Sequence, residues 1–155
     1  MTSYFLLKYA HVIGATVLLG TGAGIAFFML LAHLSGKPAL IAGVARIVVI
    51  ADFLFTASAV LIQPLTGWLL MREVGYSVKE TWIVLSLLLY VVTGLFWLPV
   101  VWMQMRMRDF AKAAAANGAP PPKAYHRLFR LWFAFGFPAF ASVLGILWLM
   151  ITRPS

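Results

Sequence analysis

Residues 4–34 read YFLLKYAHVIGATVLLGTGAGIAFFMLLAHL, an apolar run in which Lys8 is the one permanently charged residue. A helix needs about 20 residues to cross the hydrocarbon core of a bilayer, so this run predicts a membrane-spanning helix. A secretory signal has a shorter apolar segment, of about 7–15 residues, behind a basic start. We therefore interpret residues 4–34 as a helix that is retained in the mature protein.

Three more apolar segments of sufficient length follow, at residues 39–71, 82–105 and 128–151. They lack the alternating segments of about 10 residues that are typical of a membrane β-barrel. Glycine and proline separate the segments, and we expect the third helix to continue along the membrane surface as far as Asn117. The sequence predicts an all-α polytopic protein, with a single four-helix transmembrane domain over residues 1–155.

The composition supports this fold class and excludes several others. Of the 155 residues, 63% are hydrophobic and 10% are charged, whereas soluble domains average about 45–50% apolar and 25% charged residues. The absence of cysteine excludes disulfides, thiolate zinc sites and cysteine nucleophiles. With four spans in so short a chain, any chemistry is expected among the helices.

The net charge of +8 is explained by orientation in the membrane, so it does not require a nucleic-acid partner. Half of the twelve basic residues flank the third connection: Arg106, Arg108, Lys112, Lys123, Arg127 and Arg130. Basic residues concentrate in cytoplasmic loops. We therefore expect the first and third connections inside, both termini outside (N-out/C-out), and the lipid bilayer as the main partner.

His11 is the leading candidate for a functional residue. Ionisable groups within the membrane are costly and usually have a role, and a neutral imidazole is a common metal ligand that also binds haem iron. The alternative is a structural hydrogen bond to a carbonyl or hydroxyl group. Gly22, on the same helix face, leaves room for a flat macrocycle, although close helix packing uses the same small residues. Lys8 would pair with a haem propionate or extend its amine to the interface.

Four weaker metal candidates lie near the helix ends. Met71 and Met150 fall at roughly the level of His11, where a methionine would complete the coordination of haem iron, and the alternative for each is apolar packing. His33 and His126 belong to the opposite surface, where we expect them as neighbours. They are either interfacial histidines or a second metal or haem site.

Asp52 is the candidate catalytic residue, because it is the one acidic residue deep within a span. It does not face Arg46 on an ideal helix, so we expect a partner on another helix or a protonated carboxyl. It is either a proton-relay carboxylate or a structural partner of a hydroxyl group. Prolines inside the second, third and fourth spans (Pro64, Pro99 and Pro138) are expected to free backbone carbonyls and bend the helices.

Several segments resemble known families. Lys8-Tyr-Ala-His11 and Leu31-Ala-His33 resemble the first helix of the HemJ-type protoporphyrinogen oxidases and, more distantly, the CopD membrane proteins. The likeness continues in short motifs on the other helices, at Arg46, Leu65–Leu70, Phe129–Arg130, Pro138 and Arg153–Pro154. The whole chain also resembles a bacterial family described as predicted four-helix integral membrane proteins.

The resemblance implies an oligomeric bundle that binds haem b in the bacterial inner membrane, with His11 as the matching histidine. The HemJ pattern has a lysine and a histidine in the third helix where this chain has Ser86 and Phe96. The likeness therefore extends to the haem-binding scaffold and not to the full set of residues for protoporphyrinogen oxidation.

We expect a multi-pass, haem-b-binding homo-oligomer with a redox or haem-handling role. A haem-dependent oxidoreductase with a redox partner, a haem carrier and a sensor would all use the same site. Two alternatives stay open. One is a cofactor-free accessory or binding subunit, and the other is a transporter of a small solute or metal that uses Asp52.

Overall fold

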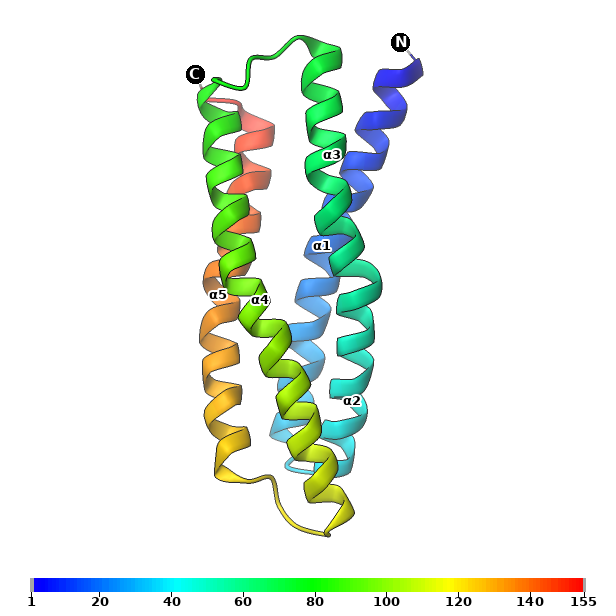
Figure 1. The fold of residues 1–155 in the computed structure, drawn as a ribbon, viewed down its shortest axis with the longest axis vertical. Coiled ribbons are helices and arrows are strands. Elements are labelled where there is room, and N and C mark those ends of the chain that lie inside the picture. The colour runs from blue at the N-terminus through cyan, green and yellow to red at the C-terminus, as the bar shows by residue number, and fades with distance from the viewer. Residues whose placement is uncertain (1, 155) are drawn as a thin grey trace.

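The computed structural model describes residues 2–154 as an elongated bundle of helices (Figure 1). Its elements are α1 (Thr2–Leu34), α2 (Pro38–Ala51), the π-helical turn η1 (Asp52–Thr56), α3 (Ala57–Val74), α4 (Thr81–Ala116) and α5 (Lys123–Thr152). Since α2, η1 and α3 follow one another without a break, they form one span. Within the described residues there are four helical segments long and apolar enough to cross a membrane, and no strands. The predicted fold class is confirmed.

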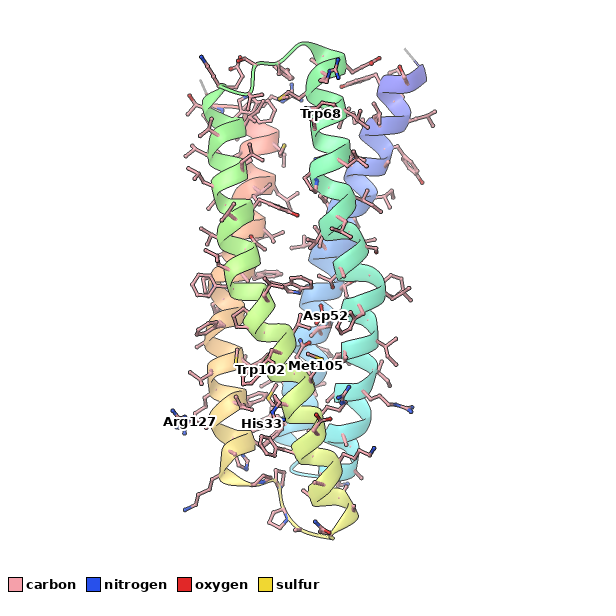
Figure 2. All side chains as sticks on the ribbon, in the orientation of Figure 1. His33, Asp52, Trp68, Trp102, Met105 and Arg127 are labelled. Carbon is pink, nitrogen blue, oxygen red and sulfur yellow. The ribbon has the colours of Figure 1, made fainter. Side chains whose placement is uncertain are left out.

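The two ends of the bundle differ in charge. Both termini and the α3–α4 connection lie at one end, which we call the terminal end (Figure 1). The α1–α2 and α4–α5 connections lie at the opposite end, which we call the basic end. Its basic residues on or beside these connections are Lys37, Arg106, Arg108, Lys112, Lys123, Arg127 and Arg130; Figure 2 shows Arg127 and His33 near this end.

Glycine and proline define most helix boundaries, as predicted. Gly36 and Gly75 end their helices with φ angles of 65° and 82°, a left-handed conformation that glycine adopts at little cost. Pro38 is the first residue of α2, where its missing N–H is not needed. The fourth span begins at Lys123, earlier than the predicted residue 128, because the helix starts directly after the prolines.

The second span contains a turn that the sequence did not predict. In η1 the Asp52 carbonyl accepts a hydrogen bond from the N–H of Ala57, five residues later, as in a π-helix. Proline has no N–H, so Pro64 cannot bond to the carbonyl of Val60. The hydroxyl of Tyr90 on α4 donates to that carbonyl instead, at 2.6 Å.

The main cluster of buried apolar side chains lies in the half of the bundle nearest the basic end, whereas a few others, such as Ala59, Trp82 and Ile83, are buried elsewhere. The cluster is formed by side chains from α1, α2, α4 and α5: Ile25, Met29, Ala32, Ile41, Ala45, Val48, Val100, Met103, Met107, Ala111, Tyr125, Phe129 and Trp132. Toward the terminal end the bundle continues as two helix pairs, α1 with α3 and α4 with α5. Within residues 2–154, α3 makes almost no close backbone contact with α4 or α5.

Candidate functional site

His11 lies in the terminal half, at the contact between α1 and α3. Its Nδ1 is 2.8 Å from the Thr66 hydroxyl oxygen, and the Thr66 hydroxyl donates its proton to the Ile62 carbonyl at 2.9 Å. With its proton directed to Ile62, the Thr66 hydroxyl accepts a hydrogen bond from the Nδ1–H tautomer of His11. In this tautomer Nε2 carries a free lone pair.

Two glycines allow this close contact. The Gln63 side-chain amide donates to the His11 carbonyl at 2.8 Å, and a Cβ on Gly14 would lie 2.7 Å from the Gln63 nitrogen. A Cβ on Gly67 would lie 3.3 Å from Cε1 of the His11 ring. A methyl group at Gly14 would therefore displace the Gln63 amide, and one at Gly67 would press on the His11 ring. We call His11, Gly14, Gln63, Thr66 and Gly67 the His11 site.

Nε2 of His11 is open to a ligand. It has no hydrogen-bond partner among the described residues, and it is not one of the fully buried unpaired polar atoms. The histidine side chain is half-buried. Nε2 can therefore accept a hydrogen bond or bind a metal from outside the α1–α3 contact.

The other residues predicted for a cofactor lie at separate positions along α1, α3 and α5. Lys8 is exposed one turn closer to the terminal end, with its amine 5.6 Å from the centre of the Tyr4 ring. Gly22 lies on the same face of α1, about 16 Å farther along the axis, and a Cβ there would meet nothing within 4 Å. Met71 and Met150 are partly buried, and within residues 2–154 neither forms a hydrogen bond with His11.

Asp52 lies near mid-height in the bundle (Figure 2) and is only 3% exposed. The indole N–H of Trp97 on α4 donates to its Oδ1 at 3.4 Å, so the expected partner on another helix is present. Thr56 and Gln104 also lie close enough to this carboxyl to interact with it, although Oδ2 of Asp52, Oγ1 of Thr56 and Oε1 of Gln104 form no hydrogen bond of good geometry among the described residues. Arg46 is exposed and forms no ion pair with Asp52. We call Asp52, Thr56, Trp97 and Gln104 the Asp52 cluster.

His33 is held within an aromatic group at the basic end. Its Nδ1 is 3.1 Å from the Tyr125 hydroxyl, and its ring stacks on Phe129 with the ring centres 3.6 Å apart. The ring centre of His126 is 5.6 Å away. His33 and His126 are therefore neighbours, as predicted, and the contacts around His33 are those of a packed aromatic residue.

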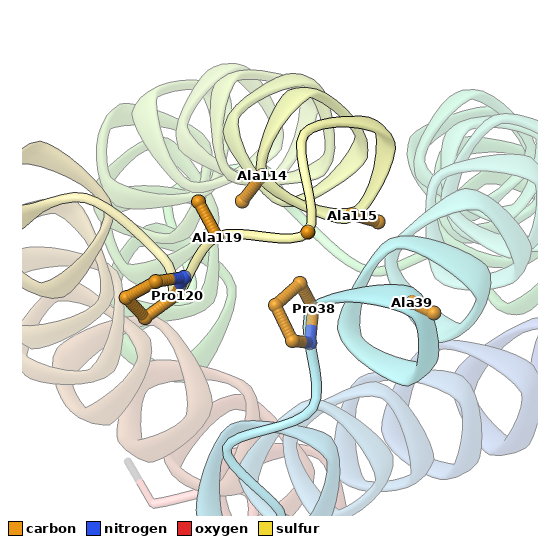
Figure 3. A pocket seen from close by; sticks show the side chains of 7 residues that line it. Pro38, Ala39, Ala114, Ala115, Ala119 and Pro120 are labelled. Atoms are coloured by element: carbon orange, nitrogen blue, oxygen red, sulfur yellow. The ribbon is translucent and has the colours of Figure 1, made fainter.

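Two open pockets on the surface of the bundle are lined without ionisable groups. One, of about 320 Å³, opens at the basic end (Figure 3) and is lined by Pro38, Ala39, Ala114, Ala115, Gly118, Ala119 and Pro120. The other, of about 330 Å³, is a groove lined by Gly20, Thr21, Gly24, Ile25, Phe28, Ile47, Val48, Ala51 and Phe55. Within residues 2–154, no three His, Cys, Asp or Glu side chains come together to hold a metal ion.

Sequence reasoning missed the uncharged polar partners. Thr66 was not identified as the partner of His11, nor Thr56, Trp97 and Gln104 as neighbours of Asp52. A partial signal exists, since Thr56 follows Asp52 by four residues and therefore shares its helix face. The partners on other helices have no local signal.

The comparisons with known proteins identify the family. The chain matches the family model described as "Predicted integral membrane protein (DUF2269)" over residues 5–154. No curated protein and no solved structure gives a significant match, so the likeness to HemJ-type and CopD proteins finds no support there. Because the match covers nearly the whole chain, this protein belongs to the DUF2269 family of integral membrane proteins.

Proposed function

We propose that this protein binds haem b through Nε2 of His11 and uses it in a redox or haem-handling role. The observation that carries the proposal is the hydrogen bond between Nδ1 of His11 and Thr66. Histidines that bind metals usually donate their other ring N–H to a fixed acceptor, which sets the tautomer and the ring orientation. Thr66 gives His11 this arrangement.

The donor set favours haem over a bare metal ion. A transition metal in a protein usually needs three or four side-chain ligands, and no such group exists among the described residues. A porphyrin supplies four nitrogens itself, so the protein needs to provide only one or two axial ligands. A single oriented imidazole is therefore sufficient for haem.

The surroundings of His11 fit a bound group of this kind. His11 lies outside the packed core, so a ligand on Nε2 need not displace core side chains. Lys8 is exposed one turn toward the terminal end, where its ammonium group would pair with a propionate. Haem supplies one-electron chemistry when bound, and His11 and Thr66 would hold and orient it.

The proposal includes a homo-oligomer in the bacterial inner membrane, with a redox partner if the role is electron transfer. The groove described above supports close contact between copies, because Gly20 and Gly24 line it four residues apart and small residues allow helices to approach. Light scattering of the protein in nanodiscs would measure the oligomeric state. We expect more than one copy for the wild type and a shift toward the monomer for Gly20→Leu. A monomeric wild type would contradict this part.

The test is the absorbance spectrum of protein produced with ample haem and purified in mild detergent. We expect a Soret band in the wild type, its loss in His11→Ala and its retention in His33→Ala. Thr66→Val should weaken haem binding about 10- to 100-fold, the usual effect of losing an outer partner of a metal ligand, while Thr66→Ser should preserve it. A colourless wild type, or normal binding by His11→Ala, would overturn the proposal.

A further inference from the structure

The Asp52 cluster holds an uncompensated polar site near the middle of the membrane. Among the described residues, four buried side-chain atoms have no hydrogen-bond partner, and three of them belong to this cluster: Oδ2 of Asp52, Oγ1 of Thr56 and Oε1 of Gln104. Their side chains are 3%, 6% and 1% exposed. Unpaired polar atoms at this depth are costly and rare in native proteins, so the cluster requires an explanation.

The π-helical turn contains Thr56, one of these unpaired residues. Six other Ser and Thr hydroxyls in the helices bond to the carbonyl four residues earlier: Thr16, Ser58, Thr66, Ser86, Thr93 and Thr152. The corresponding carbonyl for Thr56 is that of Asp52, which accepts the N–H of Ala57 within η1, and Oγ1 of Thr56 has no hydrogen-bond partner among the described residues. The unpaired hydroxyl therefore lies in η1, and π-turns are frequent at functional sites.

Asp52 has no ion-pair partner among the described residues. In residues 2–154 the one ion pair joins Arg108 to Asp109 near the basic end. The Trp97 hydrogen bond is long, at 3.4 Å, and reaches only Oδ1. A carboxylate in this position is stable only with a counter-charge or a proton.

We propose that Oδ2 of Asp52, Oγ1 of Thr56 and Oε1 of Gln104 bind a monovalent alkali cation. All three unpaired atoms are oxygens, the donors that hard cations prefer. A single carboxylate balances one positive charge, whereas divalent sites usually have several carboxylates.

This site is separate from the haem proposal. Thr66, which holds His11, follows Asp52 by 14 residues of the same span, or roughly 20 Å along the helix axis. Loss of cation binding and loss of haem binding can therefore be observed independently, and the cation experiment does not require haem.

The test is thermal unfolding of the purified protein in nanodiscs, in sodium, potassium or choline chloride at constant ionic strength. A cation that binds only the folded state raises the midpoint as its concentration increases. We expect a saturable rise in sodium or potassium over choline, its loss in Asp52→Asn, and weaker apparent affinity in Thr56→Val and Gln104→Leu. Ser58→Ala, an exposed hydroxyl change next to η1, should keep the wild-type response.

Two results would overturn the proposal. If the midpoint depends on pH but not on the alkali cation, Asp52 holds a proton. If it depends on neither, a structural water or a permanently protonated carboxyl satisfies the cluster. Asp52→Asn removes the buried charge, so it should be at least as stable as the wild type in choline. If Asp52→Asn is unfolded under all conditions, Thr56→Val decides between the explanations. A folded Thr56→Val that loses the cation response supports the proposal, and any other result points to a purely structural carboxyl.

Discussion

The hydroxyl of Tyr90 donates a 2.6 Å hydrogen bond to the backbone carbonyl of Val60. This carbonyl is available because the residue four positions later, Pro64, has no N–H. The bond joins α4 to α3, two helices that otherwise make almost no close backbone contact within the described chain. One proline thus provides a polar link between the two helix pairs.

The link can be measured with a double-mutant cycle. Tyr90→Phe should lower the free energy of unfolding by about 0.5–1.5 kcal/mol, the usual range for such a bond. Pro64→Ala restores an N–H that can bond to Val60 within the helix, so Tyr90→Phe should cost less in that background. Denaturation in mixed micelles gives all four free energies. Equal costs of Tyr90→Phe in the two backgrounds would contradict the proposed role of Pro64.

His33 is expected to contribute to stability. Its ring stacks on Phe129 and contacts the Tyr125 hydroxyl, so His33→Ala removes a stacking contact and a hydrogen bond within a buried group. We expect a loss of about 1–3 kcal/mol, measured by the same denaturation. The matched control is His126→Ala, whose side chain is exposed and whose loss should change stability little. A neutral His33→Ala would show that the aromatic group does not hold this end together.

The α1–α3 contact is expected to be sensitive to the size of residue 14. Gly14→Ala places a methyl group 2.7 Å from the Gln63 nitrogen, so it must displace the amide that bonds to the His11 carbonyl. We expect a loss of about 0.5–1.5 kcal/mol, the usual contribution of one hydrogen bond. Gly22→Ala is the control, because its Cβ meets nothing within 4 Å. If the two variants unfold at the same midpoint, the tight contact at Gly14 is not required.

The orientation in the membrane is testable because the chain has no cysteine of its own. We choose two exposed positions for single-cysteine substitution. Lys79 lies in the α3–α4 connection, and Lys112 lies near the basic end of α4. The distribution of basic residues predicts that an impermeant maleimide labels Lys79→Cys in intact cells and Lys112→Cys only after permeabilisation. The reverse pattern would refute the N-out/C-out orientation.

The spans could be predicted because their signals are local. Hydropathy identified the apolar segments, and Gly36, Gly75 and Pro38 marked ends that the structure confirms. The π-turn could not be predicted, since residues 52–56 read DFLFT and contain neither glycine nor proline. The turn places Asp52 in contact with Trp97 of α4. Such contacts between helices exist only in the packed bundle, so no local sequence pattern records them.

The candidate site was predictable only in part. A lone histidine and a lone aspartate in apolar helices indicate function by their cost, so His11 and Asp52 were identified individually. Thr66 is 55 residues away from His11 in the chain, and its position depends on the register of α3 against α1. That register depends on close contacts at Gly14 and Gly67, whose importance is clear only once both helices are placed.

The unequal distribution of the core has a mechanical consequence. At the basic end, separating the helices requires breaking a dense set of apolar contacts, so this end is stiff. Toward the terminal end, moving the α1–α3 pair away from the α4–α5 pair disrupts few contacts, chief among them the Tyr90 bond. Fewer backbone contacts therefore oppose separation of the two helix pairs at the terminal end than at the basic end.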